Sequence, residues 1–187
     1  MIGYAFCGSF CTFSRSYNAM KSLIDNGYEI LPIMSESAYS FDTRFWRAEI
    51  FREQVENVCG RKTIHTIVDA EPLGPKKPLD ALIIAPCSGN TLAKMAAGIT
   101  DSTVLMAAKA HLRSDRPLLI ALASNDAMSS NLKNIGTMLM RKNVYFAKLK
   151  QDDPDKKPHS LVSDFENIPE YLEMAMCGKQ ARPLFYY

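Results

Sequence analysis

The most constraining feature of this sequence is an apolar run that leads through small polar residues into a helical pattern. The run "ALIIAP", residues 81–86, has no polar position, which is typical of a strand covered on both faces in a parallel sheet. Residues 87–91 are Cys, Ser, Gly, Asn and Thr, and a helical pattern begins near residue 91. The sequence therefore predicts a strand that ends in a short polar loop at a helix start.

The same alternation of strand and helix recurs along the chain. Apolar or alternating patterns predict strands at residues 2–7, 28–35, 62–70, 81–86, 117–124 and 144–149, with helical patterns between them. This order predicts an α/β fold: one doubly wound parallel sheet of about six strands, flavodoxin-like or Rossmann-like. The common strand order 3-2-1-4-5-6 would place the first and fourth predicted strands side by side. We expect a domain over residues 1–150, with a linker and a C-terminal helix, residues 151–187, packed on it.

The carboxyl ends of these two neighbouring strands carry the candidate binding residues. The first strand is followed by Gly8 and Ser9, and the fourth by a second polar loop. Each loop precedes a helix, whose free N–H groups and positive dipole end suit an anion such as a phosphate. Either loop alone is more typical of an ordinary helix cap, but two such loops that meet at the switch point of the sheet favour a ligand site. The full set of candidate cofactor-binding residues is Gly8, Ser9, Ser35, Ser88, Gly89, Asn90, Thr91, Ser124 and Asn125.

Two residues are candidates for a catalytic role. Cys87 lies beside a helix start that favours a thiolate, but a buried cysteine more often behaves as a small hydrophobic residue. Asn125 follows the fifth predicted strand, where an amide can bond a ligand carbonyl or a carboxylate, or simply form a turn. The catalytic residues are otherwise unassigned.

Composition narrows the class of protein. The net charge of +2 gives no reason to expect a nucleic-acid or anionic-membrane partner, and no apolar run is long enough to span a bilayer. The five cysteines are an odd number and the start of the chain lacks a basic leader, so we expect a reduced, cytoplasmic protein. The three histidines are far apart in sequence, so no metal site is expected.

The segment "APCSGNTLAKMAAGITDS" resembles the PxSxNTxAKxAxGxxD signature of the flavin-containing cysteine decarboxylase superfamily. This superfamily includes phosphopantothenoylcysteine and lantibiotic-peptide decarboxylases, with flavin prenyltransferases as relatives. "CGS" and "PIMSESA", after the first two strands, are similar to its flavin-contacting segments. The resemblance covers roughly residues 1–148 and implies a flavodoxin-like fold, bound FMN and a homo-oligomer, a trimer or higher.

Three longer blocks, residues 74–102, 107–136 and 142–162, resemble one branch of this superfamily. Members of that branch act with an A subunit that carries NADP or NAD, and together they oxidise dihydrodipicolinate to dipicolinate in the mother cell of a sporulating bacterium. The resemblance implies a small dicarboxylate substrate, for which Lys76, Lys77, Arg113 and Arg116 are candidate partners. Two alternatives stay open: a stand-alone FMN-dependent decarboxylase, and a non-catalytic partner of the A subunit that has lost flavin. Against the decarboxylase, Pro72 stands near the position where those enzymes place an active-site histidine.

Overall fold

A seven-stranded sheet forms the centre of the molecule. The computed structural model describes residues 1–74, 76 and 79–186 of the 187-residue chain. The strands run in the order β2-β1-β3-β4-β7-β6, with β5 paired to β4. Their bounds are β1 Ile2–Phe6, β2 Ile30–Met34, β3 Ala81–Cys87, β4 Leu118–Ser124, β5 Val144–Phe146, β6 Leu149–Gln151 and β7 Leu161–Ser163. Strands β1 to β5 pair in parallel, whereas β7 pairs antiparallel with β4 and with β6.

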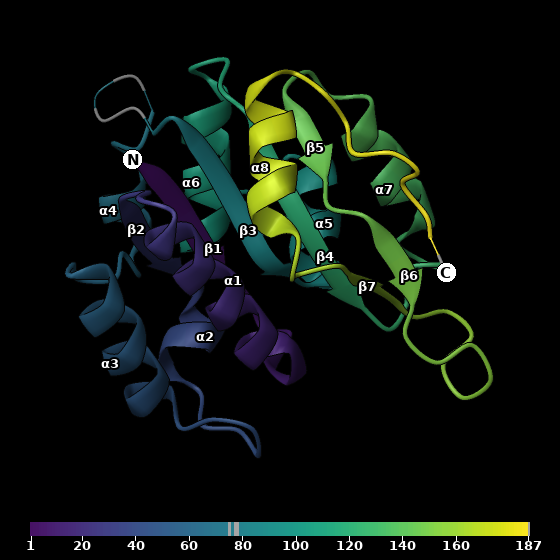
Figure 1. Ribbon diagram of the computed structural model, residues 1–187, viewed down its shortest axis with the longest axis horizontal. Coiled ribbons are helices and arrows are strands. Elements are labelled where there is room, and N and C mark those ends of the chain that lie inside the picture. Colours follow the sequence, from purple (N-terminus) through teal and green to yellow (C-terminus); the bar gives the residue numbers. More distant parts are fainter. Residues whose placement is uncertain (75, 77–78, 187) are drawn as a thin grey trace.

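Helices cover both faces of this sheet, as Figure 1 shows: α1 and α8 lie across the near face, and α5 and α6 lie behind it. The helices are α1 Phe13–Asp25, α2 Glu36–Ser40, α3 Ala48–Cys59, α4 Ile67–Ala70, α5 Gly89–Ala96, α6 Thr103–Leu112, α7 Leu132–Leu139 and α8 Ile168–Met176; a 3₁₀ turn, η1, spans Phe10–Thr12. Successive strand side chains point to opposite faces, so Tyr4 and Phe6 enter one core while Ala5 and Cys7 enter the other. The single α/β fold predicted from the sequence is confirmed.

The neighbouring positions of the two predicted loop-bearing strands are also confirmed. Strand β1 pairs directly with β3, in a parallel register that joins Ile2 to Ala81 and Ala5 to Ile84. The carboxyl ends of both strands therefore lie side by side, and the carboxyl end of β4 lies next to that of β3.

The predicted strand at residues 62–70 is wrong. Only Ile64 forms a bridge, to Ile33 of β2, and the chain then turns into α4. The cause is local: the Thr66 hydroxyl accepts a hydrogen bond from the Asp69 backbone N–H and caps the helix. Strand β2 is consequently the edge strand. The other predicted strands keep the expected order, since β2, β1, β3, β4 and β5 are successive neighbours in the sheet, and the third predicted strand is reduced to the bridge that Ile64 forms beside β2.

The polar segment after β5 contains more regular structure than its sequence indicates. Residues predicted to form a strand end and a linker include β6 and β7, which extend the sheet beyond β4 by antiparallel pairing. Helix α8 follows and packs on β3, β4 and β5. Among the described residues no helix has the length and apolar character needed to cross a membrane.

Candidate functional site

A cleft of about 840 Å³ opens where β1, β3 and β4 end. Its size falls within the usual range for small-molecule and cofactor sites. The loops after all three strands contribute to its walls, and so do charged side chains from three other segments. Of the candidate cofactor residues, those that line the cleft are Gly8, Ser9, Ser88, Gly89, Asn90, Ser124 and Asn125.

The loop after β1 is tied to the end of β4. The Ser9 hydroxyl donates a 2.7 Å hydrogen bond to the Ala123 carbonyl, and the Ser9 backbone N–H donates to the Cys7 carbonyl. Both donors of Ser9 are therefore used inside the protein, and this residue shapes the cleft wall. Gly8 approaches helix α2 closely, since a Cβ at this position would lie 3.2 Å from the Ser37 hydroxyl.

The loop after β3 begins helix α5 at the cleft. The Ser88 hydroxyl accepts a 3.2 Å hydrogen bond from the Thr91 backbone N–H and shares a second one with the Thr91 hydroxyl, 3.0 Å away. The first N–H groups of a helix have no partner within the helix. The Ser88 hydroxyl accepts from the N–H of Thr91, so the N–H groups of Gly89 and Asn90 remain for a ligand in the cleft that both residues line.

The loops after β3 and β4 meet at Gly89. A Cβ on Gly89 would lie 2.3 Å from the Ser124 hydroxyl and 2.7 Å from both Asn131 Nδ2 and Asp126 Oδ1, so only glycine fits. Asp126 accepts a hydrogen bond from Ser124 and 2.9 Å bonds from the Asn131 amide to both of its carboxylate oxygens. The bond from Ser124 is the main reason that the pKa of Asp126 is lowered. Asp126 was not predicted as a site residue.

Three predicted residues lie behind the cleft wall. Thr91 is almost completely buried, and Ser35 is a buried cap of α2 whose hydroxyl accepts from the Ala38 backbone N–H. Cys87 is fully buried, its thiol donates to the Ser88 carbonyl at 3.6 Å, and burial raises its pKa well above the ordinary value. A buried thiol of raised pKa carries little thiolate, so Cys87 has the properties of a small hydrophobic residue. The other catalytic candidate, Asn125, is in contrast exposed in the cleft.

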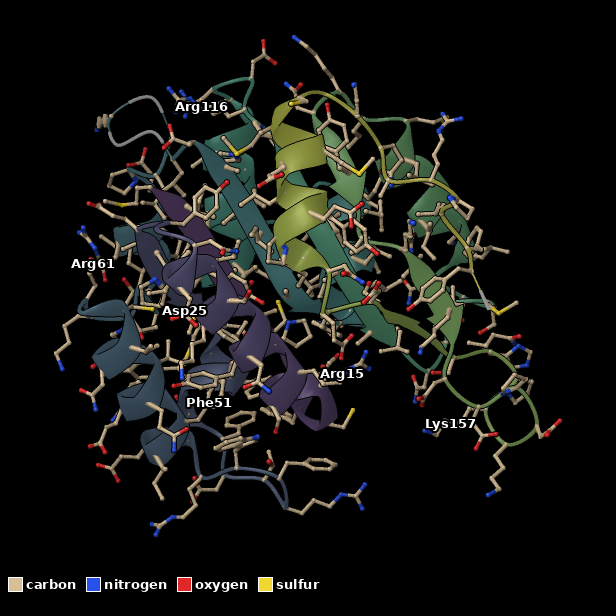
Figure 2. All side chains as sticks on the ribbon, in the orientation of Figure 1. Arg15, Asp25, Phe51, Arg61, Arg116 and Lys157 are labelled. Carbon is tan, nitrogen blue, oxygen red and sulfur yellow. The ribbon has the colours of Figure 1, made fainter. Side chains whose placement is uncertain are left out.

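Charged side chains form the rest of the cleft. Arg15 from α1, Arg44 from the loop between α2 and α3, and Lys157 from the loop after β6 all line it, and Asp152 pairs with Lys157. Sequence reasoning missed these cations because they come from segments far apart in the chain. The arginine it proposed instead, Arg116, bonds Asp80 and the Leu79 carbonyl at the opposite end of the sheet (Figure 2).

Other candidate cations also lie away from the cleft. Arg113 lines a separate hollow between α5 and α6, and Lys76 is absent from the cleft lining. Lys77 lies outside the described residues. Within residues 1–74, 76 and 79–186, no cluster of three or more His, Cys, Asp or Glu side chains is placed to hold a metal ion.

The chain belongs to the Flavoprotein family, whose model matches residues 1–155. Within that family it groups with the B subunits of dipicolinate synthase. The B subunit of dipicolinate synthase from Bacillus subtilis (strain 168) is 39% identical over 183 residues, which cover 98% of this chain and 92% of the relative. The crystal structure of the dipicolinate synthase B subunit from Bacillus halodurans matches with a TM-score of 0.91 and 36% identity, covering 100% of this chain and 95% of that one.

A more distant structure shares the fold alone. The FMN-dependent cysteine decarboxylase SpaF matches with a TM-score of 0.66 at 21% identity, over 95% of each chain. The resemblance identified from the sequence signature is thus confirmed at the level of family and fold.

Proposed function

We propose that this chain binds FMN in the cleft and acts as the B subunit of a dipicolinate synthase. Together with the A subunit of dipicolinate synthase, which would carry NADP or NAD, it would oxidise dihydrodipicolinate to dipicolinate during sporulation, in the cytoplasm of the mother cell. The observation that carries this proposal is the convergence of three small-polar loops on one cleft, in a chain that groups with dipicolinate synthase B subunits.

The residues of the cleft fit a flavin mononucleotide. The N–H groups at the start of α5 suit its phosphate, and the glycines at positions 8 and 89 let the neighbouring segments pack closely around the cleft. The side-chain amides of Asn90 and Asn125 make no hydrogen bond within the described part of the chain, and both line the cleft. These amides are therefore available to the polar edge of a flavin ring. Ser35 and Thr91, behind the wall, would hold the loops in place.

Bound flavin would supply a two-electron acceptor. Oxidation of a dihydropyridine is favoured by the aromaticity of its product, so the protein has mainly to bind and orient the substrate against the acceptor. The side-chain amides and the cations that line the cleft are suited to binding and orienting the substrate. Buried Cys87, in contrast, is not placed for covalent chemistry.

We also propose that the chain forms a homo-oligomer, a trimer or higher, through the loop between α2 and α3. Phe41 and Phe45 are exposed in this loop, and Ile50 is exposed in the first turn of the helix α3 that follows; Phe45 also lines the cleft. Exposed apolar side chains that gather on one surface are typical of protein contacts. Association on this surface would cover the cleft mouth, and a measurement of molecular mass in solution tests it. A monomeric mass at micromolar concentration would contradict the oligomer.

The test of the cofactor is whether the purified chain keeps FMN after desalting, read from the flavin absorption band near ~450 nm. Wild-type protein should stay yellow, and Asn90→Ala and Ser88→Ala should weaken retention. Ser102→Ala is the matched control, because Ser102 caps α6 by accepting from the Leu105 N–H at 3.3 Å, in the same way that Ser88 caps α5. A wild-type protein that stays colourless would contradict flavin binding and favour a partner that has lost flavin.

A further inference from the structure

One wall of the cleft carries a guanidinium that is held in place by the protein. Arg15 Nε and Nη2 donate hydrogen bonds to the two carboxylate oxygens of Glu166, both at 3.0 Å. The centre of the guanidinium also lies 5.2 Å from the centroid of the Phe165 ring. A guanidinium has five N–H donors, so the pairing with Glu166 leaves three of them for a ligand in the cleft that Arg15 lines.

The segment that holds Arg15 is itself fixed. Asp164 accepts hydrogen bonds from the Tyr171 hydroxyl at 2.6 Å and from the Asn167 amide at 2.8 Å, and its backbone N–H donates to the Lys148 carbonyl. Phe165 is fully buried. Glu166 therefore holds one edge of the Arg15 guanidinium and the Phe165 ring covers one face before any ligand arrives. This lowers the conformational entropy that Arg15 loses on binding.

Arg15 and Arg44 are the two guanidinium groups that line the cleft, and Arg15 keeps three N–H donors beside its pair with Glu166. Lys157 is paired with Asp152, and the Asp126 carboxylate is bonded to Ser124 and Asn131. Arg44 forms no ion pair among the described residues and lies over the Phe45 ring, 4.8 Å from its centroid. Two arginines on one cleft suit a ligand with two anionic groups.

We propose that Arg15 binds one carboxylate of the dicarboxylate substrate, that Glu166 positions Arg15 for this contact, and that Arg44 serves the second carboxylate. This inference rests on the proposed function of the same cleft. Two groups of cleft residues then have different tasks: the loops at Gly8 and Gly89 hold the cofactor, and the arginines recognise the substrate. A planar guanidinium matches a carboxylate with two parallel hydrogen bonds, which a lysine cannot reproduce.

The experiment measures binding of dipicolinate and of picolinate, which lacks one carboxylate, by calorimetry. The FMN-loaded chain is titrated by itself and in complex with the A subunit, in buffer free of divalent cations. Arg15→Gln should weaken dipicolinate binding about 10- to 100-fold, the usual effect of losing charge-assisted hydrogen bonds, and should reduce the preference over picolinate. Arg15→Lys should recover only part of the loss, and FMN retention should not change.

Two further variants separate recognition from simple charge balance. Arg15→Gln leaves Glu166 unpaired near the cleft, so the double variant Arg15→Gln/Glu166→Gln removes that charge as well and should still bind dipicolinate weakly. Arg61→Gln is the matched control. Arg61 forms a 3.0 Å ion pair with Glu29 outside the cleft, as its position in Figure 2 shows, and its loss should change the binding of neither ligand.

Three other results of these titrations would contradict different parts of the proposal. Undiminished dipicolinate binding by Arg15→Gln, or its full recovery in the double variant, would contradict the role of Arg15 and leave the proposed function intact. Loss of FMN with dipicolinate binding retained would make Arg15 a ligand of the flavin phosphate instead. A wild-type protein that bound neither FMN nor dipicolinate, alone or with its partner chain, would overturn both the inference and the proposed function.

Discussion

Replacing Gly89 with alanine tests the contact that holds the cleft together. The new methyl group would lie 2.3 Å from the Ser124 hydroxyl, so that oxygen must retreat by about 1 Å to restore ordinary van der Waals contact. Ser124 is not free to move, because it is bonded to Asp126, which is bonded in turn to Asn131. Overpacking of this kind costs about 1–3 kcal/mol, whereas the higher helix propensity of alanine would return up to ~1 kcal/mol.

The net expectation is a loss of about 1–2 kcal/mol in the free energy of unfolding and about 10-fold weaker FMN retention. Urea denaturation measures the first, with an unchanged slope and a lower midpoint, and flavin fluorescence measures the second. Gly136→Ala is the control: Gly136 lies in α7 with nothing within 4 Å of its Cβ position, so alanine should stabilise the protein by about 0.5–1 kcal/mol. A Gly89→Ala protein as stable and as tightly flavin-bound as wild type would show that the loops do not depend on this contact.

Three other changes probe the rest of the molecule. Phe51→Ala removes a fully buried ring that packs on two other phenylalanines, and should cost about 3–5 kcal/mol, or roughly 10 °C in Tm. The bonds from Arg15 hold the pKa of Glu166 at about 2, below its ordinary value of 4.5, so stability present above pH 4.5 is lost as the pH falls toward 2. The difference in Tm between wild type and Glu166→Gln should therefore shrink as the pH is lowered from 4.5 toward 2. A difference that stays constant over this pH range would contradict the ion pair between Arg15 and Glu166. A thiol reagent at neutral pH should label exposed Cys11 in the native protein but Cys87 only after unfolding, as followed by mass spectrometry; rapid native labelling of Cys87 would count against its burial.

The part of the site that could be predicted follows from sheet geometry. Gly8, Ser88 and Asn90 come shortly after strands whose apolar sequences predict a central position in a parallel sheet. In such a sheet the carboxyl ends meet at one edge, so the residues that follow them converge without any knowledge of side-chain contacts. Ser124 and Asn125 belong to the cleft for the same reason.

The rest depends on contacts between distant segments. Arg15 lies in the first turn of α1 and reaches the cleft in partnership with Glu166, which is 151 positions later in the chain. Asp126 has a defined role only because Asn131 and Ser124 bond it where Gly89 allows close approach. No periodicity in the sequence reports such pairings.

Short elements were the least predictable part of the fold. Strand β7 spans Leu161–Ser163 and exists because the end of β4 and strand β6 pair with it. At residues 62–70 the alternation typical of a strand competes with the cap at Thr66, and the cap prevails after Ile64. Three or four residues carry too little pattern for local sequence to decide between such outcomes.

The measurement that bears most directly on the cleft as the site of dihydrodipicolinate oxidation is the rate of dipicolinate formation in a reconstituted mixture. The A subunit, its nicotinamide cofactor and dihydrodipicolinate would be combined with no second chain, with the wild-type chain carrying FMN, and with the Gly89→Ala variant. We expect rapid formation only with the wild-type chain, and a rate with Gly89→Ala that falls with its flavin content. Equal rates in all three mixtures would contradict a role for this cleft in the reaction.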